Sequence, residues 1–206
     1  MPWEKNFDHD TALDRAMTLF WTRGYRGVSM ADLVEELGVN RSSLYSTFGQ
    51  KEDLFVQALA RYDATHRQAW LDQLAVRRDP IDAIRQVFVE IAETPDATRR
   101  LGCLLVNTTI ELPDESPRSA AVVQQAFADT RQFFEQQLLR ARHDGELEPA
   151  VDIAALADTL LALFLGMRVL ARAELAADTV EPIRRQVDVL LGSADQPGRT
   201  ENVRPG

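Results

Sequence analysis

The chain has 206 residues with one cysteine, and 32 acidic side chains outnumber 23 basic ones. The resulting net charge of −9 argues against non-specific nucleic-acid binding over the whole surface, and a lone cysteine excludes an intramolecular disulfide. The start, MPWEKNFDHD, is charged and does not predict a signal peptide. The most apolar run, Asp158 to Arg168, is shorter than the roughly 20 residues of a membrane-spanning helix. We therefore expect a cytoplasmic protein that does not enter a membrane.

Apolar residues recur with helical spacing from residue 10 to residue 192, and no segment alternates as a strand does. This pattern predicts an all-α fold. In chain order, the expected helices cover about 8–23, 29–37, 41–48, 51–76, 81–93, 97–112, 119–143, 152–176 and 180–191. We divide the chain into a three-helix module (1–52), a larger helical bundle (53–192) and a disordered polar tail (193–206).

The stretch GVNRSSLYSTFGQKEDL, residues 38–54, contains a short predicted helix that is rich in hydroxyl side chains. Helical spacing places Leu44 and Phe48 on one side and turns Ser42 and Ser46 away from the core. Because serine is a mediocre helix former, the leucine and the phenylalanine must dock this helix. With the preceding helix, which ends at Gly38, the segment has the layout of a helix-turn-helix.

A face of small hydroxyl groups suits the major groove of DNA, because serine is short and both donates and accepts hydrogen bonds. Arg41 can reach guanine or a phosphate, Tyr45 and Thr47 lie where phosphate contacts usually arise, and Lys51 opens the next helix. The segment from Arg23 to Lys51 contains four basic and three acidic residues, so its net charge is less negative than that of the remainder of the chain. The alternative interpretation is a solvent-exposed polar helix.

Residues 12–59, ALDRAMTLFWTRGYRGVSMADLVEELGVNRSSLYSTFGQKEDLFVQAL, resemble the DNA-binding domain of TetR-family transcriptional regulators. The matching positions are Phe20, Gly24, Tyr25, Ser29, Leu33, Gly38, Val39, Asn40, Leu44, Tyr45, Phe48, Lys51 and Leu54. Val34 departs from the pattern, since the family commonly has alanine there. The match in both residue type and spacing extends across three helices, which makes the resemblance specific.

The resemblance implies a repressor that binds a palindromic double-stranded operator as a homodimer and is released by a small-molecule inducer. It implies that Ser29 and Met30 begin a helix at the DNA backbone. It implies base contacts from Arg41, Ser42, Ser43 and Ser46, and phosphate contacts from Tyr45, Thr47 and Lys51. The helices at 152–176 and 180–191, with Gly166 permitting close approach, are expected to form the dimer seam.

The only cysteine lies in RRLGCLLVNTTIEL, residues 99–112. Free cysteine is often a buried apolar residue, which is one interpretation of Cys103. A thiol near Arg99, Arg100 and a helix N-terminus can instead react with oxidants or electrophiles. This stretch also resembles a TetR subgroup in which some members respond through this cysteine. Both interpretations of Cys103 stay open.

An apolar cavity in the larger bundle is the expected effector site. Its candidate residues are Phe88, Cys103, Asn107, Phe127 and Met167. The three histidines lack the spacing of metal ligands, and no catalytic motif is present, so we expect no metal, no cofactor and no enzymatic activity. Two alternatives remain: an all-helical enzyme, or a module that binds another protein through residues 30–48.

Overall fold

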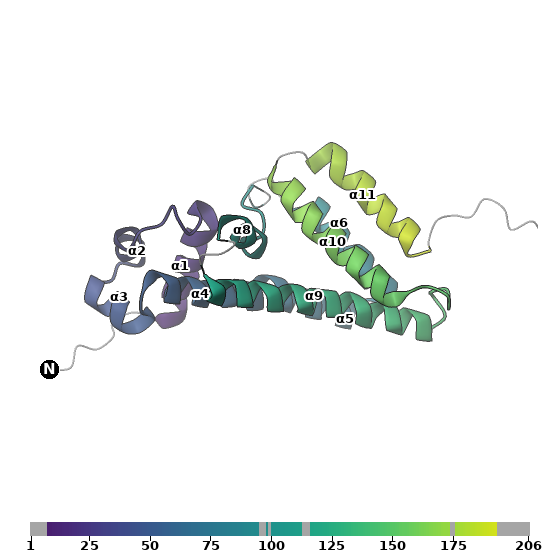
Figure 1. Ribbon diagram of the computed structural model, residues 1–206, viewed down its shortest axis with the longest axis horizontal. Helices are drawn as coiled ribbons and strands as arrows, with labels where there is room; N and C mark the ends of the chain where they lie inside the picture. Colours follow the sequence, from purple (N-terminus) through teal and green to yellow (C-terminus); the bar gives the residue numbers. More distant parts are fainter. Residues whose placement is uncertain (1–7, 95–97, 99, 113–115, 174–175, 193–206) are drawn as a thin grey trace, which may run out of the picture.

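A computed structural model of the chain describes residues 8–94, 98, 100–112, 116–173 and 176–192, and all regular structure in these ranges is helical (Figure 1). The predicted all-α fold is therefore confirmed. The helices are α1 (His9–Arg23), α2 (Met30–Leu37), α3 (Arg41–Phe48), α4 (Lys51–Tyr62), η1 (Asp63–Gln68), α5 (Ala69–Arg77), α6 (Pro80–Ala92), α8 (Leu104–Glu111), α9 (Pro117–His143), α10 (Ile153–Arg172) and α11 (Ala176–Leu190). The predicted disordered tail lies outside the described residues.

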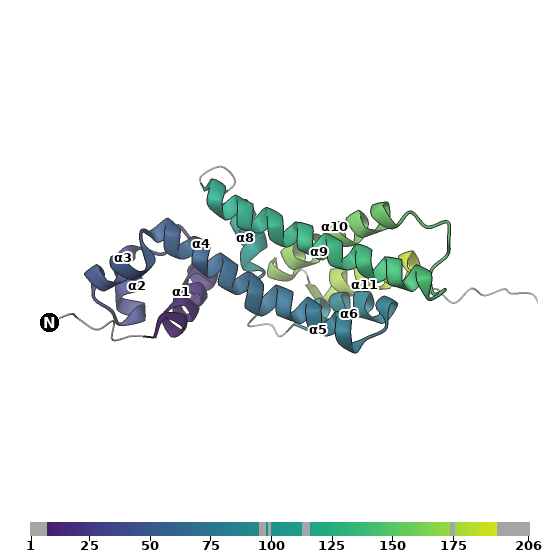
Figure 2. The ribbon, with the colours of Figure 1, turned by 90° about the horizontal axis from the view of Figure 1, so that it is seen from below.

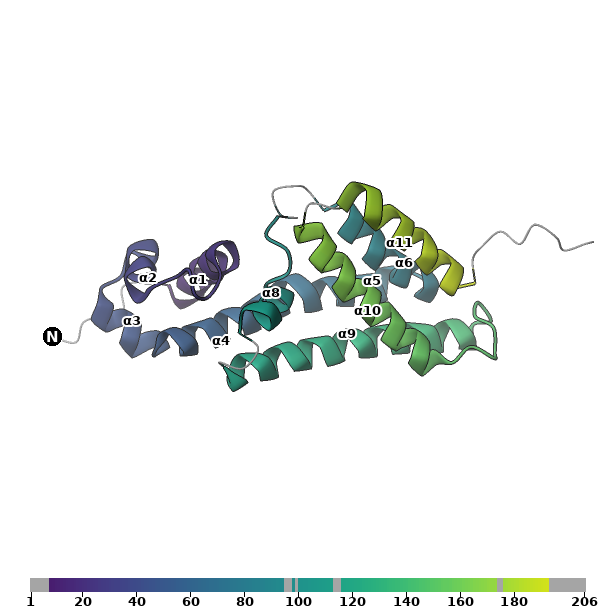
Figure 3. The ribbon, with the colours of Figure 1, turned by 45° about the horizontal axis from the view of Figure 1, so that its top comes forward.

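The molecule is elongated, and helices α1–α3, which we call the headpiece, occupy one end (Figures 1 and 2). The α4–η1–α5 rod and the long helix α9 run side by side along the molecule, while α6, α10 and α11 pack at the far end (Figure 3). Helix α8 lies between the headpiece and this bundle, beside α4 and α9. A change in the bundle can therefore reach the headpiece through α4 or α8.

Side-chain caps fix where the headpiece helices begin. The carboxylate of Asp8 accepts a hydrogen bond from the backbone N–H of Thr11, and Asn40 accepts one from Ser43. Ser29 and Asp32 form the predicted capping box at the start of α2. Gly38 then ends α2 in the left-handed conformation, with φ of +68°, which glycine adopts without strain. Polar caps and a glycine thus produce the tight turn between α2 and α3.

The helix predicted at 51–76 is not regular, because six residues form the π-helical segment η1. Arg67 of this segment is only 6% exposed, pairs with Asp63 and donates a hydrogen bond to Thr130 of α9 at 3.3 Å. The wider turn of a π-helix coincides with this buried ion pair, and the hydrogen bond from Arg67 to Thr130 links the rod to α9. The hydrophobic periodicity of the sequence did not predict this π-helical segment.

The helix predicted at 97–112 begins later than expected, at Leu104. Gly102 precedes it with φ of +66°, a backbone conformation that a right-handed helix does not contain. Cys103 is consequently the residue before the first helical turn, and its backbone carbonyl accepts a hydrogen bond from Asn107. The shortened helix directs Glu111, at its other end, toward the headpiece.

Two hydrophobic clusters hold the chain together. The first joins α1–α4 to α8 and the start of α9, and it contains Phe20, Leu44, Phe55 and Leu105. The second joins α5, α6, the remainder of α9, α10 and α11. The buried side chains of α4 thus pack in the same cluster as the headpiece, from Leu54 to Tyr62, while the predicted boundary between residues 52 and 53 stays a prediction.

Helix α10 is the one described helix whose length and apolar composition match a membrane span, with a mean hydropathy of 1.9. Its contacts offer another explanation for that composition. Leu160, Phe164 and Met167 are buried in the second cluster, and α10 packs against α9, α11 and α6. Apolar core helices meet the same length and composition criteria, so the hydropathy of α10 does not indicate a membrane protein.

Candidate functional site

Helix α3 is held by two buried residues, as its sequence predicts. Leu44 is fully buried and Phe48 is 2% exposed, and both belong to the first hydrophobic cluster. The ring of Phe48 also lies 4.8 Å from the ring of His9 in α1, measured between centroids. This anchoring fixes the opposite side of α3 as an outer surface of the headpiece.

The outer surface of α3 carries Arg41, Ser42, Ser43 and Ser46, which we call the serine face. Arg41, Ser42 and Ser46 are exposed, and Ser43 is half-buried. The Ser46 hydroxyl donates to the backbone carbonyl of Ser43 at 3.1 Å, which leaves its oxygen able to accept from a partner. Arg41 donates to the hydroxyl of Tyr45 at 3.4 Å, and its guanidinium lies 5.6 Å from that ring.

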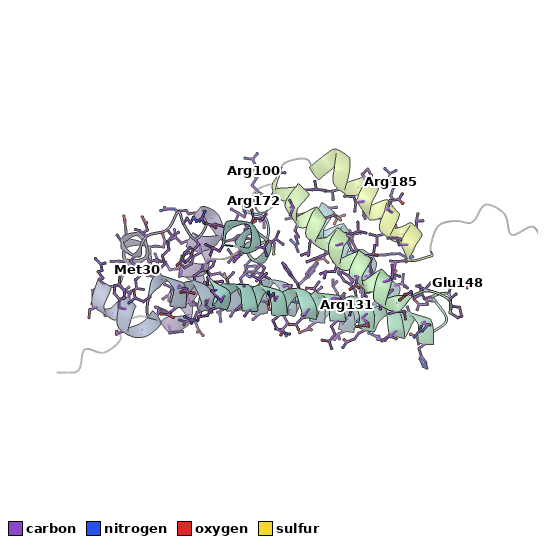
Figure 4. The ribbon with its side chains drawn as sticks, in the orientation of Figure 1. Met30, Arg100, Arg131, Glu148, Arg172 and Arg185 are labelled. Carbon is purple, nitrogen blue, oxygen red and sulfur yellow. The ribbon has the colours of Figure 1, made fainter. Side chains whose placement is uncertain are left out.

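The other predicted DNA contacts differ in how freely their polar groups meet solvent. The Ser29 hydroxyl is engaged with Asp32 in the α2 cap, and Met30 is half-buried at the headpiece end of the molecule (Figure 4). The Thr47 Oγ1 is shielded from solvent and has no hydrogen-bond partner among the described residues. Lys51 places its Nζ 4.1 Å from the ring centroid of Tyr25. Partial burial lowers the pKa of Lys51, and the charges of Glu111 and Asp32 oppose that shift.

Glu111, at the end of α8, ties the bundle to the turn between α1 and α2. Its carboxylate accepts hydrogen bonds from the backbone N–H groups of Tyr25 at 3.0 Å and Arg26 at 2.7 Å. Gly24 makes the approach possible, because its φ is +74° and a Cβ there would lie 2.9 Å from Glu111 Oε2. A shift of α8 would therefore pull directly on the headpiece.

A cavity of about 150 Å³ lies where α1 meets the rod, α6 and α10. Its lining consists of Trp21, Tyr62, His66, Ile91, Thr94, Thr98, Gly102, Arg168 and Ala171, and we call it the junction cavity. The Trp21 indole donates to the backbone carbonyl of Gly102 at 3.0 Å and meets the Tyr62 ring edge-on at 5.0 Å. The headpiece therefore supplies one wall of a cavity whose other walls belong to the rod and the bundle.

Burial shifts the pKa of two side chains that line the junction cavity. Burial lowers the pKa of His66, opposed by a backbone hydrogen bond at Tyr62 and by the charge of Asp14. Burial, followed by the proximity of Cys103, raises the pKa of Tyr62 well above its ordinary value. Both effects favour the neutral forms near pH 7.

The structure does not bring the five predicted effector residues together. Phe88 and Met167 are fully buried in the second cluster, and Asn107 donates to the backbone carbonyl of Leu101 at 2.8 Å. Phe127 lines a separate groove between α8 and α9. Cys103 is 6% exposed and adjoins the junction cavity through Gly102 and Tyr62. Their role in effector binding stays a prediction.

Sequence reasoning missed the lining of the junction cavity, including Trp21, Tyr62, His66 and Arg168. One signal was present, because Arg168 is the first basic residue in the apolar run that begins after Asp158. Arginine is almost never buried in a protein interior without a partner, so a charge in such a helix indicates a special environment. The aromatic residues gave no comparable signal, since most aromatic side chains belong to the core.

The fold and the serine face define a helix-turn-helix DNA-binding protein with a helical regulatory body. Residues 12–58 match the family model for bacterial regulatory proteins of the tetR family, and residues 76–187 match that for the tetracyclin repressor-like C-terminal domain. The chain belongs to the TetR family of bacterial transcriptional regulators.

Relatives match it over most of its length. An uncharacterized regulator of Bacillus subtilis, YezE, is 34% identical over 93% of this chain and 98% of its own. The Escherichia coli transcriptional repressor ComR is 34% identical over 82% of this chain and 81% of its own. A cysteine mutant of the TetR-family regulator CifR, solved with 26-bp operator DNA, has a TM-score of 0.72 at 30% identity, covering 91% and 96% of the two chains.

Proposed function

We propose that this chain is a cytoplasmic homodimeric repressor that binds a palindromic operator through α3 and leaves it when a small molecule enters the junction cavity. The observation that carries the proposal is the serine face, exposed on a helix that Leu44 and Phe48 anchor. The operator complex of CifR and the repressor activity named for ComR support it. The serine face contacts bases in this proposal, and Tyr45, Thr47 and Lys51 contact phosphates once DNA is bound.

The outer face of α10 supports a dimer. Small or apolar exposed residues recur on it with helical spacing, at Ala155, Thr159, Ala162, Gly166 and Val169, beside the exposed Asp158, which pairs with Arg131 of α9. Within the described part of the chain, a Cβ at Gly166 would meet no atom within 4 Å beyond its own helix backbone and chain neighbours, so a second helix has room to approach closely. On α11, Val189 and Leu190 are exposed as well. Two copies joined here would present two α3 helices to successive major grooves, about 34–36 Å apart.

Release follows from the position of the junction cavity. Trp21 belongs to the headpiece, and its hydrogen bond to Gly102 crosses the cavity wall. A ligand that favours a different separation of Trp21 from the rod changes the angle of the headpiece and the spacing of the two α3 helices. Ligand and operator then weaken each other by the same factor, about 5- to 150-fold for typical coupling.

Modification of Cys103 is a second route to the same change, because this thiol adjoins two lining residues, Gly102 and Tyr62. A thiol adduct would fill space between α8 and the rod. The test compares operator release by N-ethylmaleimide or hypochlorite in the parent and in Cys103→Ser. Unchanged release in the variant would exclude this thiol as the sensor.

The main test selects double-stranded DNA from a random library and measures the affinity of the selected site by gel shift at several salt concentrations. We expect one palindromic site, an affinity that falls steeply with salt, and a large loss in Arg41→Ala. The matched control is Arg77→Ala, an exposed arginine at the end of α5. Absence of any selected site or salt-sensitive shift would overturn the proposal and favour a protein-binding module. Turnover that survives loss of DNA binding would favour an enzyme.

A further inference from the structure

Among the described residues that line the junction cavity, Arg168 alone is an arginine or lysine, and one of its donors is buried without a partner. Its Nε is shielded from solvent and has no hydrogen-bond partner within the described part of the chain. The guanidinium instead lies 5.5 Å from the ring centroid of Trp70 and 5.4 Å from that of Phe164. These cation–π contacts hold the guanidinium in place. They do not supply acceptors for its N–H groups, which lie in the guanidinium plane.

The shielded Nε of this side chain is costly, because it has left water without gaining a hydrogen bond in return. No ion pair to Arg168 is present among the described residues, and none of the nine described lining residues is acidic. The chain as a whole has nine more acidic than basic residues. The composition of the chain therefore does not explain why the described lining contains an arginine and no acidic residue. An anionic ligand would supply the hydrogen-bond acceptor that the described residues do not.

We propose that the junction cavity takes a small monocarboxylate with about one ring, and that Arg168 binds its carboxylate. The guanidinium fork matches a carboxylate with two parallel hydrogen bonds, which gives direction as well as charge. This inference rests on the proposed function, since it names the class of molecule that acts at the same cavity.

The volume and the lining of the cavity indicate the size and the chemical character of the part of the ligand beyond its carboxylate. A volume of about 150 Å³ equals that of an engineered protein cavity that admits benzene. Trp21, Tyr62 and His66 supply aromatic walls, and the rings of Tyr62 and His66 are stacked at 4.8 Å. Thr94 and Thr98 add hydroxyl groups to the lining. A single aromatic ring fits this space, whereas a larger fused ring system does not.

A second arginine beside the cavity also favours an anion. Arg172 packs beside the cavity, since a Cβ at Gly102 would lie 3.2 Å from its Cδ. Positive charge beside a cavity raises the local concentration of an anionic ligand and speeds its association.

A purely structural role for Arg168 is the competing explanation, because its stacking on Trp70 and Phe164 stabilises the fold without any ligand. The two explanations differ in what they predict for ligand charge. A structural arginine has no preference between benzoate and benzamide, which have almost the same shape. A carboxylate-binding arginine prefers benzoate strongly, and this comparison needs no variant that has to fold.

The experiment titrates the full-length protein calorimetrically at pH 7.5 with acetate, benzoate, phenylacetate, benzamide and inorganic phosphate. We expect benzoate or phenylacetate to bind at least tenfold more tightly than benzamide, and acetate to bind weakly. In Arg168→Gln this preference should disappear, in Arg168→Lys it should be partly retained, and in Arg77→Gln, with the same change of net charge, it should persist. The bound carboxylate should also release the selected operator in a gel shift.

Equal or tighter binding of benzamide in the parent would overturn the inference, as would binding of no carboxylate or tightest binding of phosphate. An undiminished preference in a folded Arg168→Gln protein would overturn it as well. If neutral compounds release the operator while carboxylates do not, the inference fails and the proposed function stands. If no operator is selected at all, the proposed function fails, whatever benzoate does.

Discussion

The serine face and the junction cavity are built from the sequence in opposite ways. The serine face comes from one eight-residue helix, and its residues share a side because of helical spacing alone. The junction cavity collects side chains from α1, α4, η1, α6 and α10, together with Gly102 before α8. A surface that one helix defines can evolve by single substitutions, whereas the cavity depends on how six segments pack.

The two regions also differ in how closely function and stability are connected. Arg41, Ser42 and Ser46 are exposed, so their replacement should change DNA binding without weakening the fold. Tyr62 is buried and Arg168 is partly buried, so their replacement affects ligand binding and packing together. Substitutions in each region therefore test whether the serine face separates DNA binding from stability as the structure indicates.

The largest effect is expected where the serine face meets the core. Leu44→Ala removes a fully buried side chain and should lower the free energy of unfolding by about 2–5 kcal/mol. Ser42→Ala, two residues earlier on the outer side, should change it by no more than about 0.5 kcal/mol. Urea denaturation followed by circular dichroism measures both. Similar losses in the two variants would show that α3 is not oriented as described.

The next effect concerns DNA affinity. Arg41→Ala should weaken binding of the selected operator by about 1–3 kcal/mol, while the unfolding free energy stays near that of the parent. If Arg41 contacts a base, the loss should be confined to the cognate site. If it contacts a phosphate, all sequences should weaken equally and the salt slope should fall by about one. An unchanged affinity in gel shifts would remove Arg41 from the interface.

The same contrast explains what the sequence could and could not predict. Caps at Ser29 and Asn40, the glycine turn and the inward Leu44 and Phe48 are local signals, and all are present in the structure. The cavity gave no such signal, because Trp21 and Arg168 are 147 positions apart in the sequence and meet only through packing. The candidate effector residues were chosen from single apolar helices, so most of them lie in the hydrophobic core instead of the cavity.

The sequence pattern also did not predict two irregular features of the backbone. The π-helical turn at Arg67 and the delayed start of α8 after Gly102 both arise from tertiary contacts or from one positive φ value. Hydrophobic periodicity averages over several turns, so it predicts that a helix exists better than where it changes.

A smaller effect is expected at the link between the two regions. Glu111→Gln keeps the shape of the side chain but leaves one oxygen to accept where two accept from the Tyr25 and Arg26 backbones, so one of these hydrogen bonds is lost and the other loses its charge. The unfolding free energy should fall by about 1 kcal/mol, and the ligand should release less of the bound operator. Gel shifts with and without ligand give this coupling directly. The exposed residue Glu148, remote from the headpiece in Figure 4, provides the control Glu148→Gln, which should behave as the parent.

The smallest effect, from His66, tests the cavity without touching α3. Because burial lowers its pKa below the ordinary 6.5, the unfolded chain binds this proton more readily than the folded chain does. The stability of the folded state should therefore fall as the pH drops below about 6.5. Between pH 7.5 and 5.5, the Tm of the parent should fall more than that of His66→Gln, measured by differential scanning fluorimetry.

His143→Gln, an exposed histidine at the end of α9, should follow the parent and so controls for the loss of a histidine. The lowered pKa values of Asp8, Asp32 and Asp53 lie below 3.8, so their titration falls outside this pH range. A carboxylate bound beside His66 would favour its protonated form and oppose the effect of burial. Saturating benzoate should therefore reduce the pH dependence of the parent, and a pH dependence that benzoate leaves unchanged would separate His66 from the ligand site.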